Sequence, residues 1–222
     1  MKAKALIADM AGTTIEDNGL VVQAFAMALD QLGIENNHPK RQASIDFIIE
    51  TMGQSKIEVF TELFGDEEAH VANDAFETSY LECIERQGVE AIPGVEELFD
   101  ALEEKGIALA LTTGFSPQTR DALLEALGWS NRITFALSPS DAGRGRPHPD
   151  MILKASELLG ISEMSSVAVA GDTASDMQAG VNAKAGWIVG VLTGTDDEPR
   201  LREAGASHIV DSIASIESVI ER

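Results

Sequence analysis

Short apolar runs alternate with longer amphipathic stretches along much of the chain. Runs of four or five residues rich in Ile, Val, Leu and Ala predict parallel strands that are buried on both faces. These runs span residues 5–8, 107–111, 133–137, 167–170 and 187–191, with a weaker one at 208–210. The stretches between them repeat apolar residues at helical spacing, as Val95, Leu98 and Leu102 do. The alternation predicts an α/β fold with a Rossmann-like, doubly wound parallel sheet.

One long segment interrupts this alternation. Helical periodicities follow one another at residues 22–32, 45–52, 57–63 and 69–84, with no convincing strand between them. Turn and breaker residues stand at both ends of the segment, in Asp17-Asn18-Gly19 and in Ala91-Ile92-Pro93-Gly94. We therefore expect residues 1–17 and 92–222 to form an α/β core domain and residues 18–91 to form an inserted α-helical cap domain.

Composition narrows the class of protein. The 222 residues are 44% hydrophobic, which is enough for a sizeable core. The formal net charge is −21 and basic residues do not cluster, so nucleic acid is not an expected partner. No run of about 18 apolar residues predicts a membrane span. The apolar stretch near the N-terminus is too short for a signal peptide, and Cys83 is the only cysteine, so we expect a cytoplasmic protein.

Polar residues follow the predicted strands at the positions where such sheets bind ligands. Ligands of open α/β sheets lie beyond the carboxyl ends of the strands. The residues found there are Asp9 after the first strand, Thr113 and Gly114 after the second, Arg146 after the third, and Asp172 and Asp176 after the fourth. We expect them to meet in one crevice.

Asp9, Asp172 and Asp176 give this crevice a cluster of carboxylates. Carboxylates held close together raise one another's pKa unless a cation neutralises them. Mg²⁺ prefers hard oxygen ligands and usually keeps several waters, so two carboxylates and one backbone carbonyl are enough to hold it. The cluster therefore predicts Mg²⁺ as the cofactor.

Four stretches of the chain resemble the ordered motifs of the haloacid dehalogenase superfamily. They are "DMAGTT" at residues 9–14, "LTTGF" at 111–115, "GRPHPDMI" at 145–152 and "GDTASDMQAGVNAKAGWIVGV" at 171–191. The phosphonatase-like branch, which contains phosphonoacetaldehyde hydrolases, is the most similar. That branch has Asp-x-Ala-Gly-Thr in the first motif and arginine in the third, and Ala11 and Arg146 match both features. The chain is identified as a member of this branch over nearly its whole length.

The resemblance implies a role for each motif residue. Asp9 would be the nucleophile that forms an aspartyl-phosphate. The residues implied to hold Mg²⁺ are Asp9, Ala11 through its backbone carbonyl, and Asp172, with Asp176 acting through a water or from outside the ligand shell. Thr113 and the Gly114 amide would bind phosphoryl oxygens, and Arg146 would supply fixed positive charge. The further substrate-binding positions are Thr13, Met52 and Phe115.

Ala11 cannot protonate a leaving group. Most phosphatases of the superfamily have a second aspartate at that position, which protonates the departing alkoxide. Cleavage of a carbon–phosphorus bond needs an electron sink instead, which a lysine provides by forming a protonated Schiff base with an aldehyde. Lys56 falls at the position of that lysine, four residues after Met52. Burial against Met52 and Phe115, near Arg146, would lower its pKa as this role requires.

Two neighbours of Lys56 leave its role open. Val59 and Phe115 stand where the enzymes that hydrolyse phosphonoacetaldehyde have histidine and tyrosine. A lysine that only contacts the distal group of the substrate, or one that is merely solvated, is therefore an alternative to the Schiff-base lysine.

We expect a Mg²⁺-dependent hydrolase whose partner is a small phosphonate or phosphorylated metabolite, phosphonoacetaldehyde or a related compound. One alternative is a phosphomonoesterase for small metabolites, similar to phosphoglycolate phosphatase. Another is a non-catalytic, metal-binding regulatory protein with the same fold, although the intact set of Asp9, Thr113 and Arg146 counts against it. The oligomeric state stays open, with a homodimer as one expectation.

Overall fold

The computed structural model of this protein describes residues 2–221. Its described residues contain a six-stranded sheet with the strand order β3-β2-β1-β4-β5-β6, in which all neighbours are parallel. The strands are β1 (Ala5–Asp9), β2 (Ala108–Thr112), β3 (Ala136–Leu137), β4 (Val167–Gly171), β5 (Trp187–Val191) and β6 (His208–Val210). The order changes direction beside β1, which places a ligand crevice at the carboxyl ends of β1 and β4. The predicted doubly wound α/β fold is confirmed.

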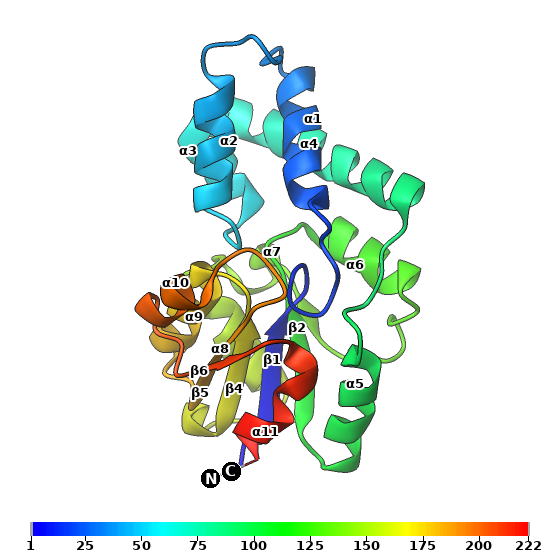
Figure 1. Ribbon diagram of the computed structural model, residues 1–222, viewed down its shortest axis with the longest axis vertical. Helices are drawn as coiled ribbons and strands as arrows, with labels where there is room; N and C mark the ends of the chain where they lie inside the picture. Colours follow the sequence, from blue (N-terminus) through cyan, green and yellow to red (C-terminus); the bar gives the residue numbers. More distant parts are fainter. Residues whose placement is uncertain (1, 222) are drawn as a thin grey trace.

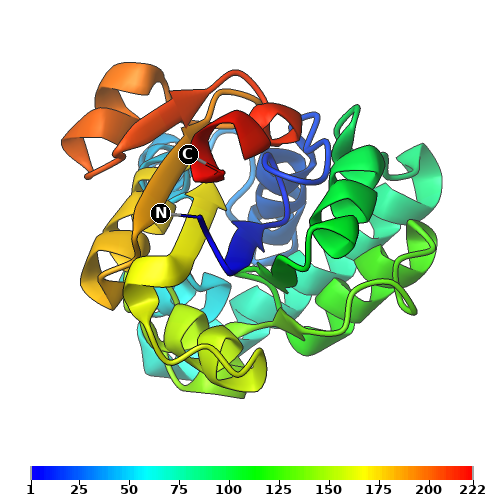
Figure 2. The ribbon, with the colours of Figure 1, turned by 90° about the horizontal axis from the view of Figure 1, so that it is seen from below.

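Helices cover both faces of the sheet, as the view from below in Figure 2 shows. The side chains of β1 alternate between the two faces: Ala5 and Ile7 belong to the same hydrophobic cluster as Ile152 of α8, whereas Leu6 belongs to the cluster that contains Val95 of α5. Every residue of β1 is buried, which explains its continuous apolar run. The helices of the core are α5 (Val95–Glu104), α6 (Pro117–Ala126), α7 (Pro139–Ala142), α8 (Asp150–Leu158), α9 (Ala174–Ala183), α10 (Glu198–Glu203) and α11 (Glu217–Ile220).

The third strand is shorter than the sequence predicts. Only Ala136 and Leu137 pair with β2, so the prediction of a strand over residues 133–137 is wrong at its start. The backbone N–H of Ile133 donates to the carbonyl of Trp129, which continues a turn through this position. Ile133 is nevertheless buried in the core, so its apolar character reflects packing without strand pairing.

Four consecutive helices form a separate layer above the carboxyl ends of the strands (Figure 1). They are α1 (Leu20–Gln31), α2 (Arg41–Glu50), α3 (Lys56–Phe64) and α4 (Asp66–Gln87), and we call them the helical layer. The layer has its own aromatic packing, in which the Phe25 ring lies 4.3 Å from that of Phe76 and 5.2 Å from that of Phe60. No described helix of the protein is both long and apolar enough to cross a bilayer.

Glu77 of α4 connects the helical layer to the core. Its carboxylate accepts hydrogen bonds from the backbone N–H of Ser116 (3.0 Å) and from the Ser116 hydroxyl (2.8 Å). Ser116 is the N-cap residue of α6, whose N-terminus favours a negative charge. Glu77 is buried, so these bonds are protected from water.

Replacing Glu77 with alanine is expected to destabilise the protein by about 1–3 kcal/mol, because it removes a buried carboxylate and leaves two donors of Ser116 without their acceptor. Thermal or urea unfolding measures this change. Glu82→Ala, which removes an exposed carboxylate from the same helix, is the matched control and should change stability by less than about 0.5 kcal/mol. Equal effects of the two substitutions would argue against a connecting role for Glu77.

Candidate active site

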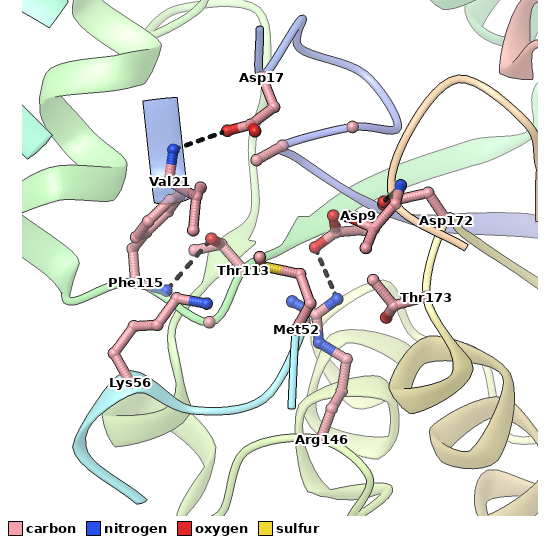
Figure 3. A pocket seen from close by; sticks show the side chains of 15 residues that line it. Asp9, Asp17, Val21, Met52, Lys56, Thr113, Phe115, Arg146, Asp172 and Thr173 are labelled. Carbon is pink, nitrogen blue, oxygen red and sulfur yellow. Dashed lines mark hydrogen bonds and ion pairs between the residues drawn. The ribbon is translucent and has the colours of Figure 1, made fainter. Parts of the chain in front are cut away.

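A small, closed pocket lies between the carboxyl ends of the strands and the helical layer (Figure 3). Its cavity volume is about 40 Å³, which leaves room for little more than a few waters. Most site residues predicted from the sequence line it, namely Asp9, Ala11, Met52, Lys56, Thr113, Gly114, Phe115, Arg146 and Asp172. The structure thus brings together residues from four strand ends of the core and from the loop before α3.

The loop between α2 and α3 closes the pocket. The backbone N–H of Lys56 donates to the carbonyl of Gly114 (3.3 Å), and the Ser175 hydroxyl donates to the carbonyl of Met52 (3.2 Å). The loop packs so closely that a Cβ on Gly114 would lie 2.5 Å from the carbonyl oxygen of Gln54. Glycine at position 114 therefore permits the closed arrangement.

Arg146 lies at the floor of the pocket beside Asp9. Its Nη1 lies 2.6 Å from Oδ1 of Asp9 and also pairs with Oδ1 of Asp176. All three side chains are buried, so the guanidinium attracts both carboxylates strongly. The Nε–H of Arg146 is buried and has no acceptor among the described residues, so the guanidinium keeps donor capacity for a further oxygen.

Asp9, Asp172 and Asp176 form the predicted carboxylate cluster. One oxygen of each lies within 4.8 Å of the others, and all three side chains are buried. Burial raises the pKa of Asp9 to about 7, helped by the charge of Asp176 and opposed by Arg146. Burial also raises the pKa of Asp172 to about 8, and the charges of Asp9 and Asp176 add to it. Such a cluster of oxygen donors, in which burial and mutual repulsion disfavour negative charge, fits a hard divalent cation.

The carboxylates of the cluster differ in their hydrogen-bond donors. Both oxygens of Asp176 accept protein hydrogen bonds, Oδ1 from Arg146 and Oδ2 from the hydroxyl of Thr173 (2.5 Å). Asp172 is held by the N–H of Thr195 (2.8 Å) and by the hydroxyl of Thr13 (2.9 Å). Thr13 was expected to contact the substrate, but it is fully buried and lies outside the described lining of the pocket. The structure instead places its hydroxyl where it orients Asp172.

Without a metal ion, the protein is expected to lose stability as pH rises from about 4 towards 8. The folded-state pKa values of Asp9 and Asp172, about 7 and about 8, exceed the ordinary value of 3.8. Between these values the folded protein holds protons that the unfolded chain has released. The stability that these bound protons contribute is fully present below about pH 4, and it is lost as pH rises through the folded-state pKa values.

Added Mg²⁺ should reverse this loss, and it should raise the melting midpoint more at about pH 8 than at about pH 6. Thermal melts with chelator and with Mg²⁺ at the two pH values measure the effect. Asp172→Ala should flatten the pH dependence and remove the response to Mg²⁺. If Mg²⁺ stabilises the wild type and Asp172→Ala equally, the carboxylate cluster is not a metal site.

Lys56 is the first residue of α3, and its side chain lies in the pocket rather than in solvent. It is 5% exposed, and its Nζ lies 5.5 Å and 5.7 Å from the ring centroids of Phe25 and Phe115. No carboxylate of the described residues forms an ion pair with it. Burial lowers the pKa of Lys56 to about 8, helped by the charge of Arg146 and opposed by acids that include Asp9. Burial and the charge of Arg146 are two of the causes that the sequence led us to expect.

This pKa changes the chemistry available to Lys56. A lysine of ordinary pKa is neutral in about one molecule in 2,500 at pH 7, whereas a pKa of about 8 makes about one in ten neutral. Only the neutral amine attacks a carbonyl carbon. Lys56 therefore has the character of a nucleophile as well as that of a cation.

Sequence reasoning missed Asp17 as a site residue and treated it as part of a turn. The structure places its side chain in the pocket, half-buried, on the same side as Lys56 (Figure 3). Burial raises the pKa of Asp17, opposed by hydrogen bonds from the N–H groups of Val21 and Gly19. The residue types give no signal for this, because Asp-Asn-Gly is typical of turns wherever it occurs.

Comparisons with known proteins agree with this geometry. The chain is 28% identical to phosphonoacetaldehyde hydrolase of Bacillus cereus (strain AH820), over 257 aligned positions that cover the whole chain and 97% of the relative. Because the chain has only 222 residues, the relative carries insertions. It is also 27% identical, over 99% of its length, to the bifunctional phosphonoacetaldehyde hydrolase/aminoethylphosphonate transaminase of Clostridioides difficile (strain 630), and it spans 40% of that protein.

Solved structures and a family model show similarity to the same group of proteins. The fold superposes on a phosphonoacetaldehyde hydrolase-like protein from Oleispira antarctica with a TM-score of 0.83 and 27% identity, over 99% of this chain and 92% of the other. The family model described as haloacid dehalogenase-like hydrolase matches residues 6–189, which include the strand ends that carry Asp9, Thr113, Arg146 and Asp172. This match confirms the resemblance found in the motifs, and the chain belongs to the haloacid dehalogenase-like hydrolases.

Proposed function

We propose that this protein is a Mg²⁺-dependent hydrolase that cleaves the carbon–phosphorus bond of a small phosphonate bearing an aldehyde, phosphonoacetaldehyde or a close relative. The observation that carries the proposal is the position of Lys56, a buried amine with a pKa of about 8 in the same closed pocket as Asp9. Ala11 lines this pocket at the position where most phosphatases of the superfamily have an acid. The names of the relatives point to the same reaction class.

The phosphoryl group of the substrate would bind at the Asp9 end of the pocket. Asp9 is the nucleophile, and its carboxylate is fixed by Arg146 at 2.6 Å. Thr113 and Gly114 also line the pocket, and the Thr113 hydroxyl and the Gly114 amide would hold phosphoryl oxygens. Arg146 keeps its charge at any pH of interest, so it stabilises negative charge that develops on the phosphoryl group.

Mg²⁺ would be held by the carboxylates of Asp9 and Asp172 and by the backbone carbonyl of Ala11, with Asp176 outside the ligand shell. When bound, the ion supplies positive charge that neutralises the carboxylates and the phosphoryl oxygens. Asp176 supports this arrangement because both of its oxygens are occupied by Arg146 and Thr173. Thr13 and Thr195 fix the carboxylate of Asp172, which sets the direction of its free lone pairs.

Lys56 would act at the carbon end of the substrate. Its neutral amine condenses with the aldehyde, takes up one proton, releases water and forms a protonated imine. When Asp9 attacks phosphorus, the electron pair of the carbon–phosphorus bond moves into the imine and gives an enamine on Lys56. The phosphoryl group is then an aspartyl-phosphate on Asp9, and its hydrolysis by water releases phosphate and restores the carboxylate. Protonation of the enamine carbon and addition of water then release the aldehyde product and the amine. No alkoxide leaves, which is consistent with Ala11 in place of an acid.

Residues 18–91 would act as the cap domain of this enzyme. Glu77 and the loop before Lys56 connect it to the core in the closed state, where water is largely excluded from the pocket. The small closed cavity implies that the cap must open to admit substrate and release product. The crossings at Asp17-Asn18-Gly19 and Ala91-Ile92-Pro93-Gly94 would be its hinges.

Hydrolysis of phosphate monoesters is the second candidate function. Val59 and Phe115, both buried, provide no polar group beside Lys56, which favours a lysine that contacts the substrate without bonding to it. A substrate with a good leaving group would then tolerate Ala11.

A substrate panel tests the proposal. Purified protein with Mg²⁺ is assayed for phosphate release from phosphonoacetaldehyde, from phosphonates without an aldehyde and from small phosphate esters. The proposal predicts release from phosphonoacetaldehyde and none from phosphonates that cannot form an imine. Release from esters alone would favour the second candidate, and no release from any compound would favour a non-catalytic protein.

A further inference from the structure

Asp17 enters the pocket from the crossing between the core and the helical layer. Its Oδ2 accepts from the N–H of Gly19 (3.1 Å) and its Oδ1 from the N–H of Val21 (3.2 Å), so the backbone at the start of α1 fixes the direction of the carboxylate. Figure 3 shows it on the side of Val21, Phe115 and Lys56, whereas Arg146 and Asp172 lie on the other side. Asp17 therefore belongs to the end of the pocket where the carbon part of a substrate would lie.

The other side chains at that end offer no acid–base chemistry. Val21, Met52 and Phe115 are apolar. Of the carboxylates among the described residues that line the pocket, Asp9 and Asp172 belong to the phosphoryl end. An acid–base step at the carbon end thus falls to Asp17 or to Lys56 itself.

Two further titratable groups lie near this end, and neither lines the pocket. Glu77 influences Lys56 electrostatically, but both of its oxygens are engaged by Ser116. Tyr80 packs against Phe115, with ring centroids 4.5 Å apart, and burial raises the pKa of its hydroxyl far above the ordinary value. Glu77 and Tyr80 are therefore unsuited to exchange protons with a bound substrate.

Asp17 and Lys56 face the same cavity without forming an ion pair with each other. Both residues line the one pocket, so a small polar group bound there lies between them. Burial favours the neutral form of both, since it raises the pKa of the acid and lowers that of the amine. An amine that can lose its proton and a carboxyl group that can exchange one, on either side of a carbonyl group, are the combination that imine formation uses.

We propose that Asp17 is the acid–base catalyst for formation and hydrolysis of the imine on Lys56, an inference that rests on the proposed function. The lone pair of Lys56 Nζ bonds to the carbonyl carbon while the carbonyl oxygen takes the proton of Asp17. The carboxylate then removes a proton from the nitrogen, which gives a neutral carbinolamine. Asp17 next gives this proton to the hydroxyl group, which leaves as water as the nitrogen lone pair forms the C=N bond. The products are the protonated imine, water and the Asp17 carboxylate, and hydrolysis runs through the reverse steps.

Acetaldehyde is the probe that tests this proposal, because it forms an imine without any carbon–phosphorus bond to cleave. Protein is mixed with acetaldehyde and quenched with excess borohydride at successive times, and mass spectrometry measures the fraction carrying a reduced adduct on Lys56. Dilution of the pre-formed imine before the quench measures hydrolysis in the same way. Asp17→Asn should slow both rates by about 10²-fold, the lower end of the usual acid–base contribution.

Two further variants separate chemistry from folding. Asp17→Ser keeps a side-chain acceptor for the backbone N–H groups but has no acid at neutral pH, so it should be as slow as Asp17→Asn. Glu16→Gln removes the same charge from the neighbouring half-buried position, which is outside the described lining of the pocket, and should match the wild type. Melting curves check that each variant is folded.

The outcomes distinguish this proposal from the proposed function. An adduct on Lys56 that forms equally fast in the wild type, Asp17→Asn and Asp17→Ser would overturn the role of Asp17 and leave the proposed function standing. Equal slowing in Glu16→Gln would show a general effect of charge and would also overturn it. The absence of any Lys56 adduct in the wild type would overturn the proposed function, and this proposal with it.

Discussion

Replacing Asp9 with asparagine is expected to reduce phosphate release by about 10⁴-fold or more, because an amide does not form the acyl phosphate that a carboxylate nucleophile forms. The side chain keeps its size, and asparagine retains a carbonyl oxygen to accept from Arg146. The fold should therefore survive. Phosphate release from the best substrate of the panel, measured with wild type and variant at equal concentration, checks this prediction.

Asp74→Asn is the matched control for that experiment. Asp74 is an exposed aspartate on α4 outside the described lining of the pocket, and its substitution should leave phosphate release unchanged. If Asp9→Asn retains most of the wild-type activity while remaining folded, Asp9 is not the nucleophile.

Replacing Lys56 with arginine is expected to reduce the rate of phosphonoacetaldehyde cleavage by about 10³-fold or more, although the positive charge remains. A guanidinium stays protonated at every accessible pH and does not form an imine. For wild-type protein, the cleavage rate should rise as pH increases towards about 8, because the amine of Lys56 loses its proton over that range. A pH series with both proteins tests the two statements together.

Lys40→Arg provides the control, since Lys40 is an exposed lysine at the start of α2 and should tolerate the change. If Lys56→Arg still cleaves phosphonoacetaldehyde, the Schiff-base role is wrong. If the protein releases phosphate only from esters and Lys56→Arg does the same, Lys56 is a contact for the distal group of the substrate.

The fold was predictable because its signals are local. Strand β1 is buried on both faces, so its residues are all apolar up to Asp9, and the strand ends carry motif residues that parallel pairing brings to one edge. The start of β3 was not predictable from the same signal. Ile133 is apolar because it packs in the core, and nothing in the sequence separates that reason from strand pairing.

The parts of the site that the sequence did not reveal depend on distant contacts. Thr13 lies within the first motif, yet its hydroxyl donates to Asp172, 159 residues further along the chain. Asp17 becomes a site residue because residues far along the chain, such as Lys56 and Phe115, line the same pocket. The aromatic face of Phe25 beside Lys56 likewise depends on how α1 packs against α3 and α4.

Trapping of the imine with borohydride tests the central claim most directly. The protein is incubated with Mg²⁺ and phosphonoacetaldehyde, reduced with borohydride and digested, and mass spectrometry locates the modified residue while released phosphate is measured in parallel. Our account predicts phosphate release together with N-ethyl-lysine at position 56, the reduced form of the imine that remains after the carbon–phosphorus bond has broken. Phosphate release with no modification of Lys56, or with modification of another lysine instead, would contradict it.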